Sequence, residues 1–397
     1  MPSAARHART PTVGAENPKG RGTPAADRLP VTVCVVNYNG ARYLAATLAA
    51  VRALRPAPAE VILVDNASTD EGPALVEARF PEVRIVRRAR NDGPGAARNS
   101  GVTAARFDRI LFLDNDVAPA PDCLPPLLRV LDADPRAVCV MPRVVHAKPA
   151  DRVQYDGVGA HLLGMNMLFH QECPHARLRT GTRPVDSMVS AAFLFDRRRW
   201  GADPPFDDAL FLYLEDHEFG LRARLLGHRI YVAPEAVCTH REGTPEVSIR
   251  ATGRYTGIRI TETILNRWQL LIKLYRLRTI LLYLPSFLLF EAMQLVGAAA
   301  RGWLPHYLRA LRLLLSGERA LLARRRAFQA RRRGDELAVV TIAPLPFNPA
   351  LARGRLDRAA QEILARVLRL NHRLVRGFRP RRRAALLGGR AERPSGN

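Results

Sequence analysis

The chain has few cysteines, and their arrangement indicates neither a metal site nor a disulfide framework. The five of them, Cys34, Cys123, Cys139, Cys173 and Cys238, are odd in number and widely scattered. Zinc sites need closely spaced cysteines, and disulfide-rich secreted domains need paired ones, so both classes are disfavoured. Structural thiols in a reducing compartment are the expectation.

An apolar core is missing from the first 28 residues, which mix Ala, Arg, Pro, Gly and Thr. A secretory signal peptide requires such a core, so these residues do not read as one. Residues 1–29 are interpreted as a disordered leader.

Acidic residues are scarce relative to basic ones. The chain has 37 Asp and Glu against 61 Lys and Arg, a formal net charge of +24, and arginine runs at 324–326, 331–333 and 381–383 crowd its last quarter. Such runs attract polyanions, either nucleic acid or an anionic membrane face, although a merely solvated tail has the same composition. No nucleic-acid module or aromatic stacking signature is present, so no specific nucleic acid is expected as a partner.

Apolar strand patterns alternate with helical ones from residue 31 onward. Buried strands are expected at 31–36, 61–64 and 83–86 and in a run that ends at Asp114, with helices near 42–54, 72–79 and 94–105. A less regular portion covers about 119–199, and a helix ending near Leu226 and a strand at 229–232 follow. This order predicts an α/β fold whose mainly parallel sheet has helices on both faces.

Polar residues follow the ends of the first four strands. They are Asn37 and Asn39, then residues 65–70, 91–99 and 114–116. Ligands of open α/β sheets gather at the carboxyl ends of the strands, so these clusters are expected to converge on one edge.

The stretch Asp114-Asn115-Asp116 places two carboxylates where a buried strand ends. Alternation along a strand sends residues two apart to the same side, which suits a divalent cation. Mg²⁺ and Mn²⁺ prefer oxygen ligands and often bridge to phosphate, so the pair indicates a phosphate-bearing substrate. A solvated turn is the alternative interpretation.

Several motifs occur together in an order that resembles the family 2 glycosyltransferases, which have the Rossmann-like GT-A fold. The resemblance covers about residues 31–245 and is greatest to the bacterial branch described as rhamnosyltransferase-like. The motifs are Val35-Val36-Asn37-Tyr38-Asn39-Gly40, Val64-Asp65-Asn66-Ala67-Ser68-Thr69-Asp70, Asn91-Asp92-Gly93-Pro94-Gly95-Ala96-Ala97-Arg98-Asn99, Asp114-Asn115-Asp116, Glu215-Asp216 and His240.

The resemblance implies transfer of a sugar, with inversion, from a nucleotide diphosphate sugar to an acceptor. Asp114, Asp116 and His240 would then hold Mg²⁺ or Mn²⁺, which stabilises the departing diphosphate. Asp216 is the implied base that takes the proton of the acceptor hydroxyl, with Glu215 orienting it. Glu215 and Asp216 can also be explained as the acidic first turn of a helix, where the helix dipole favours negative charge, and the two interpretations are compatible.

The donor side of the site is likewise implied by the resemblance. Asp65 matches the carboxylate that reads the nucleotide base, and Gly93 permits close backbone approach to the donor. Arg98 and Asn99 can reach nucleotide or diphosphate from the start of a helix. The full donor-binding set is Asn37, Asn39, Asp65, Gly93, Arg98, Asn99 and Asp114. Ser190, His217 and Glu218 depart from the pattern common in this branch, which puts the acceptor in doubt and not the reaction class.

The chain beyond residue 245, where the resemblance ends, divides into two parts. Residues 246–335 form a helical extension that is apolar and basic, and residues 336–397 form an Arg-rich tail. Residues 279–300 form an apolar stretch in which only Glu291 is charged, and the stretch is long enough to cross a bilayer. Because arginines lie on both sides, a helix lying in the membrane plane or re-entering fits better than a single crossing. A soluble helix that serves packing or dimer formation is the remaining alternative. The cytoplasmic face of the membrane is the expected location, since donor nucleotide sugars are cytoplasmic, and a glycan or lipid-linked acceptor the expected partner.

Two other functions stay open at this point. A nucleotidyltransferase that makes nucleotide sugars shares the sheet and the aspartates, but it carries a glycine-rich basic loop where this chain has Asn37-Tyr38-Asn39-Gly40. A polyanion-binding protein without catalysis fits the charge, but not the intact acidic positions.

Overall fold

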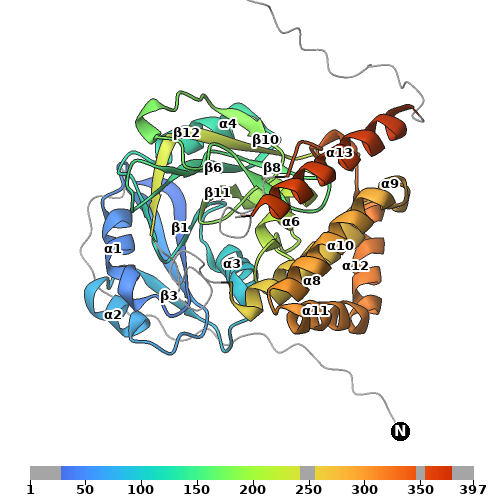
Figure 1. Cartoon of the computed structure of the whole chain (residues 1–397). Coiled ribbons are helices and arrows are strands. Elements are labelled where there is room, and N and C mark those ends of the chain that lie inside the picture. Colours follow the sequence, from blue (N-terminus) through green and yellow to red (C-terminus); the bar gives the residue numbers. More distant parts are fainter. Residues whose placement is uncertain (1–27, 242–254, 346–353, 378–397) are drawn as a thin grey trace, which may run out of the picture.

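The computed structural model describes residues 28–241, 255–345 and 354–377 (Figure 1). Within these residues, ten strands form one central sheet and two more form a small hairpin. The leader expected at 1–29 lies outside the described residues except for its last two positions, and the first strand begins at Leu29.

The first half of the sheet consists of neighbouring parallel strands in the order β4-β1-β2-β3. The intervening helices match the predicted ranges closely, and the α/β class is confirmed. The elements are β1 (Leu29–Asn37), α1 (Ala41–Arg52), β2 (Pro58–Asp65), α2 (Gly72–Arg79), β3 (Arg84–Arg87), α3 (Gly93–Ala104) and β4 (Arg109–Asp114).

The second half of the sheet mixes directions. Strand β11 runs antiparallel between β4 and β6, whereas β6 and β12 are parallel. The elements are β5 (Val117–Pro119), α4 (Leu124–Ala133), β6 (Ala137–His146), β7 (Val153–Tyr155), β8 (Val158–Ala160), β9 (Asn166–Leu168), η2 (His175–Arg177), β10 (Arg183–Val185), β11 (Ala192–Asp196), α5 (Arg197–Trp200), α6 (Glu215–Leu226) and β12 (Arg229–His240).

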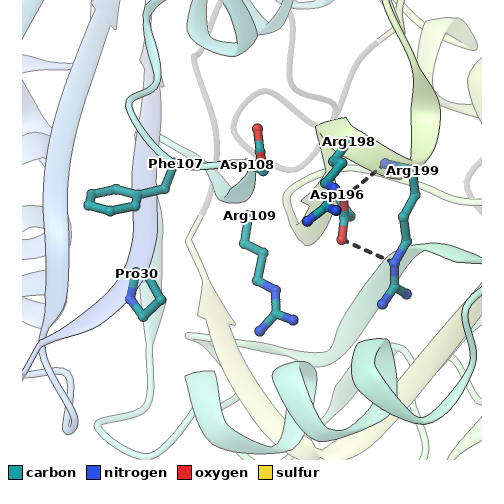
Figure 2. Close-up of a pocket in the computed structure, with 7 residues that line it drawn as sticks. All are labelled: Pro30, Phe107, Asp108, Arg109, Asp196, Arg198 and Arg199. Carbon is teal, nitrogen blue, oxygen red and sulfur yellow. Dashed lines mark hydrogen bonds and ion pairs between the residues drawn. The ribbon is translucent and has the colours of Figure 1, made fainter.

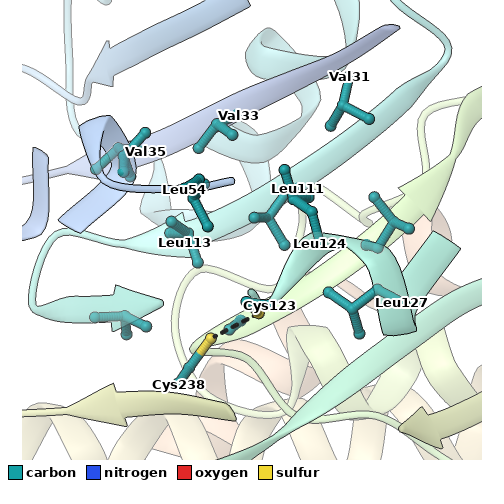
Figure 3. Close-up of a cluster of buried hydrophobic side chains, with 14 of the residues drawn as sticks. Val31, Val33, Val35, Leu54, Leu111, Leu113, Cys123, Leu124, Leu127 and Cys238 are labelled. Carbon is teal, nitrogen blue, oxygen red and sulfur yellow. Dashed lines mark hydrogen bonds between the residues drawn. The ribbon is translucent and has the colours of Figure 1, made fainter. Parts of the chain in front are cut away.

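Both faces of the sheet are buried, which is why its central strands are almost continuously apolar. Helices α1, α2 and α4 cover one face, and Figure 3 shows part of this cluster, in which residues such as Val33 and Leu111 pack against Leu124 and Leu127. Helices α3 and α6 cover the other face. The thiols of Cys123 and Cys238 meet inside the first cluster with their sulfurs 3.7 Å apart, and both are free.

Strand register brings the predicted polar positions to one edge. Asn37 pairs with Asp65 across β1 and β2, and Val36 pairs with Asp114 across β1 and β4. The carboxyl ends of the three strands are therefore level, and the convergence expected from the sequence is confirmed as geometry.

The C-terminal helices share a core with the sheet domain. Leu162 and Leu163 from the sheet domain and Leu225 from α6 pack in one buried cluster with Leu271 and Phe287 of the extension. The predicted boundary at 245/246 falls in 242–254, outside the described residues. The helices are α8 (Gly257–Leu274), α9 (Leu277–Leu282), α10 (Leu284–Ala300), α11 (Leu304–Ser316), α12 (Glu318–Arg331), η3 (Glu336–Ala338) and α13 (Arg355–Gly377).

The apolar stretch at 279–300 is divided between two helices. Helix α9 ends at Leu282 and α10 begins at Leu284, with Tyr283 buried between them. None of the helices in the described ranges combines the length and the apolar composition needed to cross a membrane. Helix α13, in the segment that composition describes only as Arg-rich, packs along α10 (Figure 1).

Candidate active site

A network of amides and hydroxyls lines the ends of β1 and β2. The Asn37 side-chain amide donates to Asp65 Oδ1 at 3.1 Å and to Ser68 Oγ at 3.0 Å, and Asn37 Oδ1 accepts from Asn115 Nδ2 at 2.9 Å. Asn39 adds two contacts, because its backbone N–H donates to Ser68 Oγ and its side-chain oxygen accepts from Thr69 N. These bonds fix the loops that carry Asn37, Asn39 and Asp65.

Arg98 joins two carboxylates that are far apart in the sequence. Its Nη2 lies 2.7 Å from Asp114 Oδ1, and its Nη1 lies 3.2 Å from Glu215 Oε1. The guanidinium is almost fully buried and lies over the rings of Phe193 and Phe206. The predicted contact of Arg98 with the donor stays a prediction, because here the side chain is directed at the two carboxylates.

Glu215 and Asp216 are both buried at the start of α6. Burial raises the pKa of Glu215 to about 8, reinforced by the adjacent Asp216 carboxyl and opposed by Arg98. Glu215 Oε2 has no hydrogen-bond partner within the described residues, which agrees with a carboxyl that is costly to ionise. Burial also raises the pKa of Asp216, opposed by hydrogen bonds from Ser190 and His217.

Two residues that depart from the pattern of the resembled branch hold Asp216 in place. Ser190 donates to Asp216 Oδ2 from both its backbone N–H, at 2.8 Å, and its hydroxyl, at 3.0 Å. The His217 backbone N–H donates to Asp216 Oδ1 at 2.7 Å, and the His217 ring contacts Ser187 Oγ at 2.6 Å. Burial lowers the pKa of His217 to about 3, so this ring is neutral and serves packing. The third departure, Glu218, is buried in ion pairs with Arg222 and Lys273.

The segment Ser190-Ala191 also connects Asp216 to the end of β4. The Asp114 N–H donates to the Ala191 carbonyl at 2.9 Å, next to the Ser190 amide that binds Asp216. The strand end at Asp114 and the helix start at Asp216 are therefore connected through two adjacent residues of one segment.

Asp116 and His240 lie side by side because β5 pairs with the end of β12. His240 Nε2 is 3.2 Å from Asp116 Oδ1, while Nδ1 is 2.8 Å from Gln154 Oε1. The Gln154 contact therefore holds the ring in the orientation in which Nε2 faces Asp116. Two ligands of one octahedral ion lie roughly 3 Å apart, so this pair fits a divalent cation.

The described residues contain no cluster of three or more acidic, His or Cys side chains that could hold a metal ion. The chain turns at Asn115 and Asp116, after β4 has ended at Asp114, so the strand alternation used to place the two carboxylates does not extend to Asp116. Asp114 faces Arg98, and its side chain remains 31% exposed.

Gly93 and Asn99 contact a protein loop in this structure. Gly93 has a φ of +90°, and an added Cβ would lie 1.8 Å from the Phe211 carbonyl oxygen. The Asn99 side chain exchanges hydrogen bonds with the backbone of Phe206 and donates to Asp208. Both residues thus hold the 205–214 loop that leads into Glu215, and their predicted contacts with the donor stay predictions.

This loop enters α6 through two strained residues. Tyr213 and Leu214 have φ values of 68° and 63°, a backbone conformation that residues other than glycine rarely adopt. The fully buried Asn266 of α8 donates to the carbonyls of Leu212 and Tyr213 at 3.0 and 2.9 Å. A residue of the C-terminal extension therefore supports the loop that places Glu215 and Asp216.

A separate cavity of about 540 Å³ lies away from this edge (Figure 2). It is lined by Pro30, near the start of β1, and Arg109, at the start of β4, so it belongs to the amino ends of the strands. The Asp196 and Arg199 side chains in it are paired with each other.

Sequence reasoning did not identify Gln154 or Asn266, and it noted Ser190 only as a departure. Gln154 reaches His240 across 86 positions, and Asn266 reaches Tyr213 across 53. Local sequence spacing does not indicate such long-range contacts. The departure of Ser190 from the family pattern, by contrast, could have indicated its contact with Asp216.

Comparison with known proteins agrees with this geometry. Residues 32–188 match the family model described as glycosyl transferase family 2. This region of the chain is therefore similar to glycosyl transferase family 2. The chain is 31% identical over 221 residues to the succinoglycan biosynthesis protein ExoO of Rhizobium meliloti, covering 55% of this chain and 59% of that protein.

A second relative of the glycosyltransferase domain is the N-acetylglucosaminyl-diphospho-decaprenol L-rhamnosyltransferase of Mycobacterium tuberculosis. It is 27% identical over 241 residues, which cover 54% of this chain and 76% of the relative. Among solved structures, GalNAc-T7 with UDP, GalNAc and Mn²⁺ superposes with a TM-score of 0.52 at 17% identity, over 68% of this chain and 51% of that one. The GT-A fold is thereby confirmed.

The buried Glu215 carboxyl predicts a pH-dependent loss of stability. The pKa of Glu215 is about 8 in the folded protein, above the ordinary 4.5 of a glutamate side chain, so between these values the folded state holds a proton that the unfolded state releases. Stability therefore falls as pH rises through this window and levels off above it. We expect Glu215→Gln to flatten this slope in urea unfolding at pH 5 to 8, while Glu82→Gln, an exposed control, keeps the wild-type slope.

The contact of Asn266 with the 212–213 carbonyls predicts a local effect of Asn266→Asp. The carboxylate cannot donate, so two buried carbonyls lose their partner, at about 1–3 kcal/mol each. Hydrogen exchange should accelerate across residues 210–217. Asn371→Asp removes a similar amide bond, from Asn371 Nδ2 to the Leu282 carbonyl, and serves as the matched control. Equal exchange at 210–217 in both variants would contradict the assignment.

Proposed function

We propose that this chain is a metal-dependent, inverting glycosyltransferase. It moves a sugar from a nucleotide diphosphate sugar to a cell-envelope or lipid-linked glycan. The observation that carries the proposal is the short connection between the strand-end carboxylate Asp114 and the helix-start carboxylate Asp216, made through Ser190 and Ala191. In this proposal Asp114 serves the leaving group and Asp216 the acceptor, and the connection through Ser190 and Ala191 supports their acting in one site.

The donor occupies the edge formed by β1, β2 and β4 in this proposal. Asp65 and the amides of Asn37 and Asn39 bind the nucleoside, and Gly93, Arg98 and Asn99 shape the loop beside the diphosphate. Support comes from the level strand ends and from the network that fixes these side chains.

Asp116 and His240 would hold the divalent cation, Mg²⁺ or Mn²⁺, with Asp114 as the third predicted ligand. When bound, the cation stabilises the negative charge of the departing nucleoside diphosphate as a Lewis acid. The 3.2 Å spacing of the two ligand atoms and the Gln154 bond that orients the imidazole support this assignment. The GalNAc-T7 structure, which shares the fold, contains UDP and Mn²⁺.

Asp216 acts as the base in this mechanism. Its Oδ2 accepts two hydrogen bonds from Ser190, and its Oδ1 accepts one from the His217 amide, so the carboxylate is held in one orientation. A raised pKa makes it a better proton acceptor once it is ionised. Glu215 faces Arg98 and fixes the start of α6, which agrees with an orienting role.

The acceptor assignment rests on the relatives. One is named for succinoglycan biosynthesis and the other for rhamnosyl transfer to N-acetylglucosaminyl-diphospho-decaprenol. Both names describe envelope or lipid-linked glycans, which favours such an acceptor here at the cytoplasmic face of the membrane. The nucleotidyltransferase and non-catalytic alternatives have no comparable support.

Asp216→Asn tests the base directly. The amide keeps the size of the side chain but cannot take a proton, so sugar transfer should fall about 100- to 10,000-fold while donor binding changes little. Transfer is measured as nucleoside diphosphate released from a panel of nucleotide sugars in the presence of acceptor. Asp122→Asn, on an exposed turn, is the control. Wild-type turnover in the Asp216 variant would remove it from the base role.

Asp116→Ala tests the metal site together with chelation. EDTA should abolish transfer, and added Mn²⁺ or Mg²⁺ should restore it in the wild-type protein and in Asp122→Ala. Asp116→Ala should need far more metal for the same rate and should bind donor weakly, because half of the ligand pair is lost. Circular dichroism confirms that the variant is folded. Full activity in EDTA would overturn the metal assignment.

A further inference from the structure

Helix α13 has two apolar stripes, and one of them faces solvent. Leu364, Leu368 and Val375 are buried against the extension. A second set is exposed: Leu356 by 86%, Ile363 by 53%, Leu370 by 59% and Leu374 by 56%. Packing within this chain accounts for the first stripe only.

The exposed set lies on one side of the helix. Leu356, Ile363 and Leu370 are seven residues apart and Leu374 follows by four, spacings that return to nearly the same angle at 3.6 residues per turn. A continuous apolar strip therefore runs along most of α13, and we call it the outer stripe.

A row of arginines runs beside the outer stripe. Arg366 and Arg373 follow Ile363 and Leu370 by three residues, which places them on the adjacent line of the helix surface, and both are exposed. Glu362 lies nearby and pairs with Arg366, with both side chains more than half exposed. Such an exposed pair is weak, so the row keeps a positive field.

Helices α9 and α10 add further exposed apolar side chains next to α13. Leu281 is 58% exposed, Leu288 60% and Val296 68%. Helix α13 is held along α10 by hydrogen bonds between Asn371 and the Ser286 hydroxyl and the Leu282 carbonyl, at 2.8 and 2.9 Å (Figure 1). The outer stripe thus belongs to a wider apolar region fixed to the folded domain.

We propose that the outer stripe of α13, with the neighbouring exposed residues of α9 and α10, docks on an anionic lipid surface. Such a surface offers hydrocarbon to the inserted leucines and negatively charged headgroups, in the layer above, to the arginines, as amphipathic helices lying in an interface require. A symmetric second copy would bring two arginine rows together, which disfavours self-association. The inference rests on the proposed function in one respect: docking would bring a lipid-linked acceptor near the site.

The test uses the full chain and vesicles. Co-sedimentation is measured with vesicles of phosphatidylcholine alone and of phosphatidylcholine mixed with phosphatidylglycerol. We expect binding to the mixed vesicles and at least about ten-fold weaker binding for Leu370→Ser/Leu374→Ser, because two exposed leucines no longer insert. Leu322→Ser, which removes a 48% exposed leucine of α12, is the matched control. Arg366→Gln/Arg373→Gln should reduce the preference for phosphatidylglycerol several-fold.

Three results would overturn the inference. The first is unchanged binding of the double leucine variant, which assigns adsorption to charge elsewhere in the chain. The second is an equal loss in Leu322→Ser. The third is a dimer in lipid-free ultracentrifugation that the double leucine variant dissociates. Release of nucleoside diphosphate from a soluble donor, measured in parallel, separates the two proposals. Release without vesicle binding would contradict the docking proposal alone. Vesicle binding without release from any donor would contradict the enzyme assignment alone.

Discussion

The buried Arg98 guanidinium is the interaction on which the candidate site depends. It lies between Asp114, which ends β4, and Glu215, which begins α6, and it donates a hydrogen bond to the carboxyl group of each. Without Arg98, the strand end and the helix start would lose the side chain that joins them. Asp216, the next residue along, is held by Ser190, so the proposed base has its position because Arg98 fixes the element that carries it.

The same site depends on residues well beyond the family 2 region. Lys273 and Arg324 form ion pairs with Asp207, which lies on the loop before α6. Burial alone would raise the pKa of Asp207, but the two cations outweigh it and lower this pKa to about 2. Asn266 binds the strained turn at the end of the same loop. Helices α8 and α12 thus support the loop that leads into α6, and they share one core with α6.

The sequence predicted the fold and the acidic positions of the site better than it predicted their contacts. The strands from 31 to 114 were predictable because buried parallel strands are continuously apolar. Asp114 was singled out because it ends such a strand, whereas the role of Asp216 came only from the family resemblance and stays a prediction. The direction of the Arg98 side chain was not readable, since its partner Glu215 is 117 positions away. Asp116 meets His240 through the pairing of β5 with β12, which the strand pattern at 229–232 did not reveal.

The contact between Asp116 and His240 originates in the backbone. Val117 and His240 are partners in a backbone ladder, so the spacing of the Asp116 and His240 side chains is set by main-chain hydrogen bonds that do not depend on the identity of neighbouring side chains. Other side chains of β5 and β12 can therefore change over evolution while these two residues keep their spacing.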